Sequence, residues 1–318
     1  MTSTDGIVID ERLVIKSDAS GPRSARMVLQ NPRVEVAVME VARGGILREG
    51  LGYDRNDIAV VTNIAPDHLG MKGIDTLEQL ADVKAVVVEA VPRNGFAILN
   101  ADDPNVRPMR NRCSGSVIWY SLMPAGSRER AFIDARLRRG GRAVVLEKTE
   151  RGDMIVIKHG ARSMQLAWTH LLPATFGGSA MFNVANSMAA AGAAFAAGIG
   201  LHEIRQGLRT FSTSYYLSPG RMNLINVRGT EVIVDYCHNA PAMEVLGQFV
   251  DRFGRDRVQH RVGEGERHAR PDGPELEAVA GEGERRGPVA VATVHRQRRQ
   301  GHRTEVEGGI RRVRIALA

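Results

Sequence analysis

The stretch VVTNIAPDHLGMKGIDTLEQLADVK, residues 60–84, decides the fold class of this chain. It opens on an apolar run rich in valine and isoleucine, which is typical of a strand buried on both faces. The run stops at a polar cluster of Asn63, Asp67 and His68, and a glycine-rich turn follows. The remainder has the pattern of a helix and carries Lys84. The stretch therefore predicts a strand, a polar loop at its carboxyl end and a returning helix.

Similar units flank this stretch. Apolar segments that are predicted to be strands cover residues 33–40, 56–64, 95–100 and 115–122, and helical segments lie between them. The helix within the opening stretch begins at a capping box, in which Thr76 is followed three residues later by Gln79. Strands alternating with helices predict a mostly parallel sheet covered on both faces. Ligands bind such sheets at the carboxyl ends of the strands, where Glu40, Asn63 and Asn100 fall.

The composition argues for a cytoplasmic globular protein. The apolar fraction is 43% and the charged fraction 25%, both ordinary values. No apolar run approaches the roughly 18 residues of a membrane span, and the N-terminus has no secretory pattern. Cys113 and Cys237 lie far apart and read as reduced thiols. The formal charge of +7 is spread out, although much of the arginine lies in the last sixty or so residues, and the sequence has no interleaved pattern of aromatic and basic residues of the kind that binds single strands. We therefore expect no nucleic acid and no membrane as partner.

Each candidate residue also has an ordinary explanation when it is taken alone. A strand-end carboxylate such as Glu40 can bind Mg²⁺, but such a residue is more often solvated or ion-paired. Asp67 and His68 can form a simple turn, and Lys84 can be a solvated lysine. The NADDPN segment beginning at Asn100 has the composition of a turn.

The same holds further along the chain. Asn183 and Asn186 lie three residues apart at the head of a small-residue helix, and capping of that helix would account for one of the two amides. Arg221 follows a Pro-Gly turn, and Asp235 with His238 lies at a strand exit. A histidine in that position is more often structural than catalytic.

Taken together, in this order and spacing, the motifs resemble the Mur-ligase-like portion of the cyanophycin synthetase family, over roughly residues 4–253. The resemblance is carried by ARGGILREGLGYDR (42–55), TNIAPDHL (62–69), NADDPN (100–105), MFNVANSMAAA (181–191), FSTSYYLSPGRMN (211–223) and VIVDYCHNAP (232–241). The first and fifth segments favour this family over the wider Mur and folylpolyglutamate ligases. The other segments are shared in kind with that wider group.

The resemblance implies an ATP-dependent ligase that forms amide bonds. A carboxylate of the substrate attacks the γ-phosphate to give an acyl phosphate, and an amine then displaces phosphate through a tetrahedral intermediate. In this family the Mur-like portion is expected to join the α-amine of arginine to side-chain carboxylates of a poly-aspartate backbone. The implied cofactors are ATP and Mg²⁺, and the implied partners are arginine and an acidic polypeptide. Catalysis of this kind depends on positioning and on neutralising negative charge.

Matching motifs assign roles to the residues near the opening stretch. Glu40 and His68 would bind Mg²⁺, and Asn100 would lie near the nucleotide. Lys84 matches the lysine that many Mur ligases carbamylate, which would turn a cation into an anion that faces the metal. Arg43 follows the metal-site glutamate and would face an acidic substrate.

The remaining assignments concern the nucleotide. Asn183 and Asn186 would contact the adenine. Arg221 and Asp235 would contact the ribose and the phosphates, with His238 close to them.

The resemblance also predicts the domain organisation. Residues 1–228 would form a Mur-ligase-like central domain, with a small antiparallel meander inserted at about 130–172. Residues 229–253 would begin a carboxyl-terminal ligase domain. No aromatic residue follows Phe253 and the hydrophobic periodicity is weak, so we expect 254–318 to be disordered.

The sequence contains no G-x-x-x-x-G-K-[ST] phosphate-binding loop. In the family this loop lies just upstream of the segment that matches TSTDGIVID (2–10). We therefore expect a truncated ligase without its phosphate loop and ATP-grasp region, inactive alone and with an unpaired sheet edge. Two alternatives fit the same residues. One is a non-catalytic binding or regulatory remnant, which forms homo-oligomers or associates with a full-length synthetase. The other is one half of a split ligase.

Overall fold

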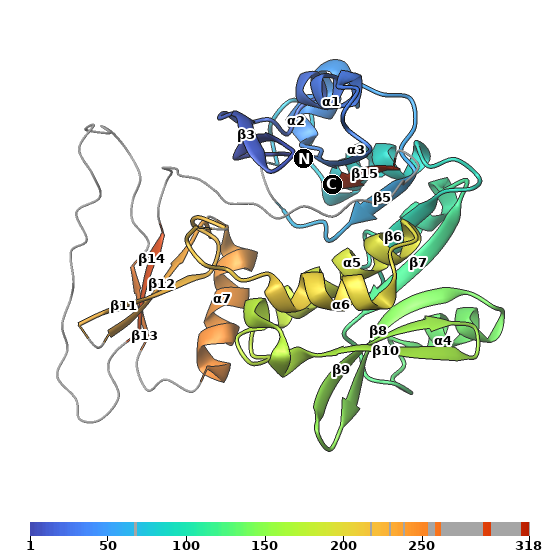
Figure 1. Ribbon diagram of the computed structural model, residues 1–318. Helices are drawn as coiled ribbons and strands as arrows, with labels where there is room; N and C mark the ends of the chain where they lie inside the picture. The colour runs from blue at the N-terminus through green and yellow to red at the C-terminus, as the bar shows by residue number, and fades with distance from the viewer. Residues whose placement is uncertain are drawn as a thin grey trace, which may run out of the picture. The chain divides into compact units, whose positions relative to one another are not determined.

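The computed structural model describes residues 1–66, 69–216, 218–228, 230–237, 239–253, 258–261, 289–293 and 313–317. The chain divides into two compact units (Figure 1). The first unit comprises Met1–Thr210 with His302–Ala318, and the second comprises Phe211–Gly301. The second unit thus begins ahead of the domain boundary predicted at residue 229.

One large sheet organises the first unit (Figure 1). In spatial order its described strands are β10 (Arg162–Trp168), β9 (Gly152–His159), β8 (Arg142–Thr149), β7 (Ser116–Ser121), β6 (Phe96–Asn100), β5 (Ile58–Val61), β15 (Val313–Leu317), β4 (Val36–Glu40), β1 (Thr2–Ser3), β2 (Gly6–Ile9) and β3 (Arg12–Ile15). Neighbouring strands run parallel from β8 to β1 and antiparallel on both flanks. The predicted α/β class with a mostly parallel sheet is confirmed, and the antiparallel meander β8–β10 continues the same sheet.

Helices alternate with the strands of this unit. They are α1 (Pro22–Gln30), α2 (Arg43–Glu49), α3 (Leu77–Glu89), α4 (Ala131–Arg138), α5 (Met181–Ala196) and α6 (Leu201–Thr210), with the short 3-10 helices η1 (Arg107–Arg112), η2 (Thr169–Leu171) and η3 (Pro173–Thr175). The predicted capping box of α3 is present: the Gln79 N–H donates to Thr76 Oγ1 at 3.2 Å, and the Thr76 N–H donates to Gln79 Oε1 at 3.1 Å. No helix in the described part of the chain is long and apolar enough to cross a membrane.

Helix α4 differs from prediction, because it lies within the insert where only strands were expected. It is a short helix anchored by Ile133 and Leu137, which are four residues apart and buried on one face. A helix of this length offers too few apolar positions for its period to be recognised from sequence.

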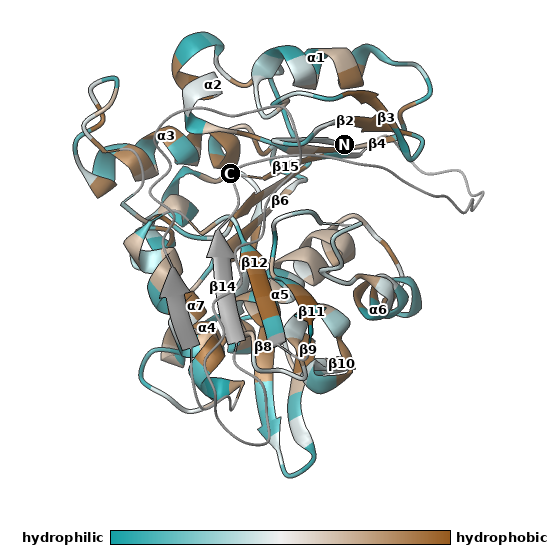
Figure 2. Ribbon diagram, turned by 90° about the vertical axis from the view of Figure 1, so that its left-hand side faces the viewer, coloured by the Kyte–Doolittle hydropathy of each residue, from teal (hydrophilic) through white to brown (hydrophobic). Residues whose placement is uncertain are grey.

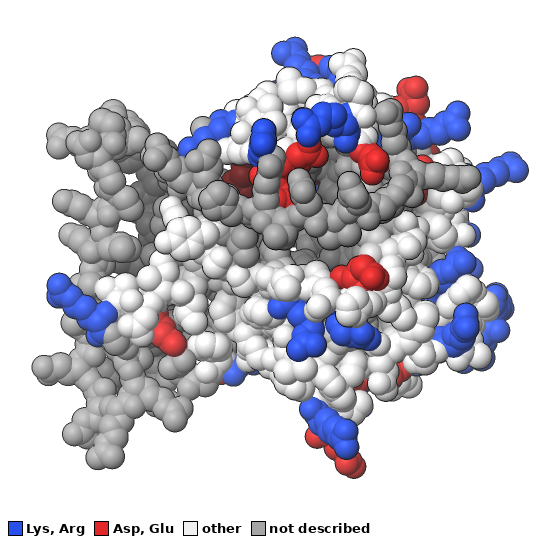
Figure 3. All heavy atoms as spheres, in the orientation of Figure 1, with Lys and Arg blue, Asp and Glu red and all other residues white. Residues whose placement is uncertain are grey.

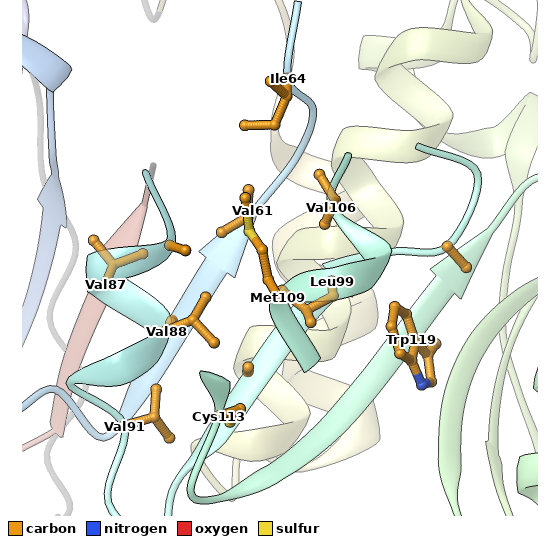
Figure 4. Close-up of a cluster of buried hydrophobic side chains, with 14 of the residues drawn as sticks. Val61, Ile64, Val87, Val88, Val91, Leu99, Val106, Met109, Cys113 and Trp119 are labelled. Atoms are coloured by element: carbon orange, nitrogen blue, oxygen red, sulfur yellow. The ribbon is translucent and has the colours of Figure 1, made fainter. Parts of the chain in front are cut away.

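Side chains of the parallel strands alternate between two cores, one on each face of the sheet. Val61 and Leu99 pack with α3 and η1 on one face (Figure 4). Ile98 and Ile118 pack with α5 on the other. Helix α5 packs very closely against the sheet at Gly192. A Cβ atom added to this glycine would lie only 3.1 Å from Ile98 Cγ2. Figure 2 shows apolar residues concentrated on these strands, with β8 becoming hydrophilic toward its end.

Strand β15 comes from the part of 254–318 that the structure describes. Residues 254–318 were expected to be disordered and the sheet to have an unpaired edge, and within that segment Val313–Leu317 forms a strand whose neighbours in the sheet are β4 and β5. Ile315 is 7% exposed and Ala316 is fully buried. A single short apolar run in a tail rich in arginine and glycine gives no periodic signal. This run forms a strand only because it pairs with strands that are far away in the sequence.

The second unit has its own four-stranded sheet. The strand order is β11 (Asn223–Val227), β12 (Thr230–Asp235), β14 (Val289–Thr293) and β13 (Val258–Arg261), and the helix is α7 (Ala240–Arg252). The predicted hairpin followed by a helix is thus confirmed as β11, β12 and α7. Asn239 caps α7 by accepting a hydrogen bond from the Ala242 N–H at 2.9 Å. Strands β13 and β14 also lie in the segment that was expected to be disordered.

Candidate functional site

The candidate site of the first unit lies at the carboxyl edge of its parallel strands. Glu40 is the last residue of β4, Asn100 is the last residue of β6, and Thr62 follows β5 directly. Because these strands are parallel, their carboxyl ends share one edge of the sheet. This is the edge at which α/β proteins bind ligands.

The carboxylate of Glu40 is fixed by one residue, Thr4, from the turn between β1 and β2. The Thr4 N–H donates to Glu40 Oε2 at 2.8 Å, and the Thr4 hydroxyl donates to Glu40 Oε1 at 2.7 Å. Each carboxylate oxygen accepts one of these bonds and keeps further lone pairs. Glu40 is half-buried. The carboxylate is therefore oriented but can still accept a cation.

Thr4 was not identified from the sequence. Its partner lies 36 residues away, and the two residues meet only because β1 pairs with β4. The one available signal is TSTDG itself (2–6), in which hydroxyl residues precede a turn.

Side chains from the neighbouring strands fix the loop that follows β5. The carbonyl oxygen of Thr62 accepts hydrogen bonds from Asn100 Nδ2 at 2.8 Å and from the Tyr120 hydroxyl at 3.0 Å. The Ile64 N–H donates to Asp103 Oδ2 at 2.7 Å. This loop leads to Asp67 and His68, both of which lie outside the described residues. The predicted metal-binding role of His68 therefore has no structural counterpart here.

The NADDPN segment forms a hydrogen-bonded turn that joins the ends of β6 and β7. The Asp102 N–H donates to Asn100 Oδ1 at 2.9 Å. The Asp102 carboxylate accepts from the Ser121 hydroxyl at 2.5 Å and from the Leu122 N–H at 2.7 Å. The sequence suggested a turn, and the structure has one. Both polar ends of the Asn100 amide are already engaged within the chain, so a ligand contact would share or displace these bonds.

Arg43 and Lys84 lie on two helices that pack against each other. Arg43 is the first residue of α2, directly after β4, and Lys84 lies in the middle of α3. Both side chains are half-buried, and both interact with other groups of the chain. The two helices that carry Arg43 and Lys84 therefore lie on the same face of the sheet.

The two asparagines of α5 form a pair on the opposite face of the sheet. Asn183 Nδ2 donates to the Ala174 carbonyl at 2.7 Å, and Asn186 Nδ2 donates to Asn183 Oδ1 at 3.3 Å. The capping residue of α5 is Ala180, which makes no side-chain cap. The capping explanation for one of the amides is therefore wrong. Asn186 is exposed, which leaves its amide oxygen accessible.

The second unit carries Arg221 and Asp235. Asp235 Oδ2 accepts a hydrogen bond from the Met222 N–H at 2.9 Å, and the Arg221 guanidinium lies 5.3 Å from the centre of the Tyr236 ring. Burial raises the pKa of Asp235, and the Met222 N–H and the charge of Arg221 oppose this shift. Burial, with the charge of Asp235, also raises the pKa of Cys237 to about 11. His238 lies outside the described residues.

The structure thus brings some of the predicted residues to one edge and separates others. Strands β15 and β5 lie between β4 and β6, so neighbouring strands about 4.8 Å apart place Glu40 roughly 14 Å from Asn100. One metal ion cannot contact both residues. Across the described residues, no group of three or more His, Cys, Asp and Glu side chains is arranged to bind a metal. Glu40 is the predicted metal ligand whose surroundings the structure defines.

The chain is similar to known proteins in sequence and in fold. The model of the Mur ligase middle domain matches residues 16–194. A cyanophycin synthetase from Crocosphaera subtropica is 45% identical over 266 residues, which cover 84% of this chain and 30% of that protein. A UDP-N-acetylmuramoyl-L-alanyl-D-glutamate–2,6-diaminopimelate ligase from Gloeobacter violaceus is 28% identical, over 78% of this chain and 45% of the relative.

A solved structure of MurF from Acinetobacter baumannii is 21% identical and gives a TM-score of 0.47, covering 70% of this chain and 43% of that one. This chain spans about a third of the length of the cyanophycin synthetases that it matches.

Proposed function

Since the chain belongs to the Mur ligase middle domain family, we propose that it supplies the nucleotide- and metal-binding core of an ATP-dependent amide-bond ligase of the cyanophycin synthetase kind. The observation that carries the proposal is Glu40, oriented by Thr4 through both carboxylate oxygens at the carboxyl edge of the sheet. The similarity to cyanophycin synthetases over 84% of the chain supports the choice among ligases.

In this proposal Glu40 binds Mg²⁺, together with His68. A half-buried carboxylate is a suitable oxygen ligand for a hard cation, and its hydrogen bonds to Thr4 leave lone pairs for one. The metal would neutralise the phosphate charge of ATP. On the α3 side of the sheet, Arg43 would face the acidic substrate. Lys84 would face the metal as an anion when it is carbamylated and would remain a cation when it is not.

The nucleotide-binding assignments are proposed for each unit by itself. Asn183 and Asn186 would contact adenine, Asn100 would lie near the nucleotide, and Arg221 and Asp235 would contact the ribose and phosphates. His238 would lie close by. Support for the amide assignment comes from the α5 pair, in which Asn183 orients the exposed Asn186.

The substrates would be an acidic polypeptide of the poly-aspartate kind and arginine. A side-chain carboxylate would attack the γ-phosphate of ATP, releasing ADP and giving an acyl phosphate. The α-amine of arginine would then displace phosphate and lose a proton as the amide forms. These 318 residues hold no phosphate loop, so turnover of ATP would require such a loop in addition to them.

The test is Mg²⁺-dependent nucleotide binding by the full chain, measured with a fluorescent ATP analogue. We expect binding that requires Mg²⁺ and weakens about tenfold or more in Glu40→Gln. The matched control is Glu49→Gln, which alters an exposed carboxylate paired with Arg23 and Arg26 outside the site. Binding that is absent, or indifferent to both Mg²⁺ and Glu40, would refute the proposal.

Catalysis is measured separately, as arginine-dependent phosphate release with poly-aspartate as acceptor. We expect none from the chain alone, and turnover only when a second chain bearing a phosphate loop is added. Turnover by the chain alone would show that this fold has another way to hold the triphosphate.

A further inference from the structure

Two connections in the meander gather basic side chains on one corner of the first unit. The connection from α4 to β8 carries Arg138, Arg139 and Arg142, and the turn from β9 to β10 carries His159 and Arg162. These five residues are called here the basic corner. The segments that supply them, residues 135–142 and 158–163, contain no Asp or Glu.

Backbone contacts bring the two connections together. The Gly160 N–H donates to the Gly141 carbonyl at 2.8 Å, and a Cβ atom added to Gly160 would lie 3.5 Å from Gly140 Cα. Helix α4 lies beside β8, the strand that follows it (Figure 1). The five basic side chains therefore belong to one surface rather than to two separate turns.

Strand pairing sets three members of the basic corner side by side. Arg142 lies directly opposite His159, and His159 lies directly opposite Arg162 on its other side. Residues that are opposite each other share a face of the sheet, and neighbouring strands are about 4.8 Å apart. The Arg142 guanidinium lies 5.2 Å from the centre of the Phe96 ring. The row is thus held by regular structure.

The nearest acids in the sequence interact elsewhere. Asp134 Oδ1 lies 3.5 Å from Arg130 Nε, and Glu147 Oε1 lies 2.5 Å from Lys158 Nζ. Among the described residues, no carboxylate forms an ion pair with the basic corner. Basic side chains directly opposite one another repel when they are charged. An anion bound across the row would relieve this repulsion.

The opposite end of the meander has a different charge pattern. The turn between β8 and β9, with the strand residues beside it, contains Glu147, Lys148, Glu150, Arg151 and Asp153. There each basic residue has an acidic neighbour in the sequence. The single sign of charge is therefore a property of the basic corner and not of the meander as a whole.

We propose that the basic corner binds an acidic polypeptide through carboxylates that bridge neighbouring guanidinium groups. The planar fork of arginine matches a carboxylate, and such pairs are strong when they are bidentate. Single-stranded nucleic acid needs exposed aromatic rings for its bases, whereas the ring at this corner, Phe96, lies beneath Arg142. A duplex is bound by about 6–10 phosphate contacts, which is more than this corner supplies.

The identity of the polypeptide rests on the proposed function, in which the acceptor is of the poly-aspartate kind. Arg142 and Arg162 begin their strands, so the basic corner lies at the amino edge of the sheet and the candidate site at the carboxyl edge. A polymer is long enough to be retained at one place while its reactive group is free at another. Weak binding at the corner would thus raise the effective concentration of the acceptor.

The test is binding of fluorescein-labelled poly-L-aspartate to the full chain, followed by anisotropy at roughly 0.02 M salt and without nucleotide. Arg139 and Arg162 are exposed. Replacing both by glutamine should weaken binding about fivefold or more. Replacing both by lysine keeps the charge and should retain most of the affinity.

The matched control is Lys148→Gln with Arg151→Gln. It removes two positive charges from exposed positions at the other end of the meander, and it should change the affinity less than about twofold. No binding by the unmodified chain, or equal losses in both glutamine variants, would overturn the proposal. A DNA duplex of equal charge that displaces poly-aspartate as effectively as unlabelled poly-aspartate does would overturn the choice of a polypeptide.

Binding of the fluorescent ATP analogue is measured on the same variants and should be unchanged by Arg139→Gln with Arg162→Gln. Absence of nucleotide binding would refute the proposed function alone, because the poly-aspartate measurement contains no nucleotide. Loss of poly-aspartate binding with nucleotide binding intact would overturn the role of the basic corner alone.

Discussion

At the residue scale, the carboxyl edge of the sheet consists of polar side chains that satisfy one another. Thr4 binds both oxygens of Glu40, and Asn100 uses its amide to bind Thr62 and Asp102. The sequence was sufficient to place Glu40 and Asn100 at strand ends, because the alternation of strands and helices is a local pattern. It could not supply their partners, because Thr4 reaches Glu40 only through the pairing of β1 with β4.

Thr4→Val tests the contact with Glu40. Valine keeps the size of threonine but removes the hydroxyl donor, so the hydrogen bond to Glu40 Oε1 is lost and the backbone bond stays. We expect the free energy of unfolding to fall by about 1–2 kcal/mol, measured by urea denaturation. Thr4→Ser should recover most of the loss. In a double-mutant cycle with Glu40→Gln, additive effects would show that the two side chains are not coupled.

Asp235→Asn tests the buried carboxyl of the second unit. Burial raises the pKa of Asp235 in the folded protein, so the folded state binds the proton more tightly than the unfolded state. The stabilisation is complete below the unfolded pKa of about 3.9 and is lost as the pH rises through the folded pKa. Asparagine does not titrate and can still accept the Met222 N–H.

We therefore expect the variant to gain stability relative to the wild type between about pH 3 and pH 7, measured by urea denaturation across that range. Asp251→Asn, at an exposed site on α7, controls for the loss of one negative charge. An equal gain in both variants would assign the effect to net charge.

At the element scale, α3 and β15 mark the two limits of what the sequence could predict. Helix α3 was predictable because its start signal, Thr76 with Gln79, is contained within four residues. Strand β15 was not, because a short apolar run in a polar tail becomes a strand only when β4 and β5 supply its hydrogen bonds. Helix α4 lies between these cases, since its two buried residues are too few to reveal a period.

Thr76→Ala tests the start of α3. The change removes the side-chain acceptor for the Gln79 N–H at the helix N-terminus. The free energy of unfolding should fall by about 1 kcal/mol, measured by chemical denaturation. Thr76→Ser keeps the acceptor and should stay close to the wild type. No loss in the alanine variant would mean that packing alone determines where α3 begins.

At the scale of the whole molecule, the chain carries an excess of positive charge. The formal net charge is +7. Figure 3 shows Lys and Arg scattered over the face in view, among the described residues, with Asp and Glu between them. Binding to nucleic acid depends on several cations that contact neighbouring phosphates together. A scattered positive charge therefore gives weak attraction to polyanions that salt readily screens.

A binding titration with a short DNA duplex tests this. We expect dissociation constants weaker than about 10 µM at roughly 0.15 M salt, with measurable binding only at roughly 0.02 M. Fluorescence anisotropy at both salt concentrations decides the outcome. Submicromolar binding at the higher concentration would reveal a basic surface that the view in Figure 3 does not contain.

The position of β15 also has a consequence for how the protein is made. A ribosome adds roughly 5–20 residues per second, so Val313–Leu317 emerges tens of seconds after β4 and β5, its two neighbours in the sheet. During that interval the nascent sheet holds two facing unpaired edges. A chaperone that binds extended apolar segments would find its target there. Synonymous codons that slow translation late in the message should therefore lengthen chaperone occupancy and lower the yield of native protein.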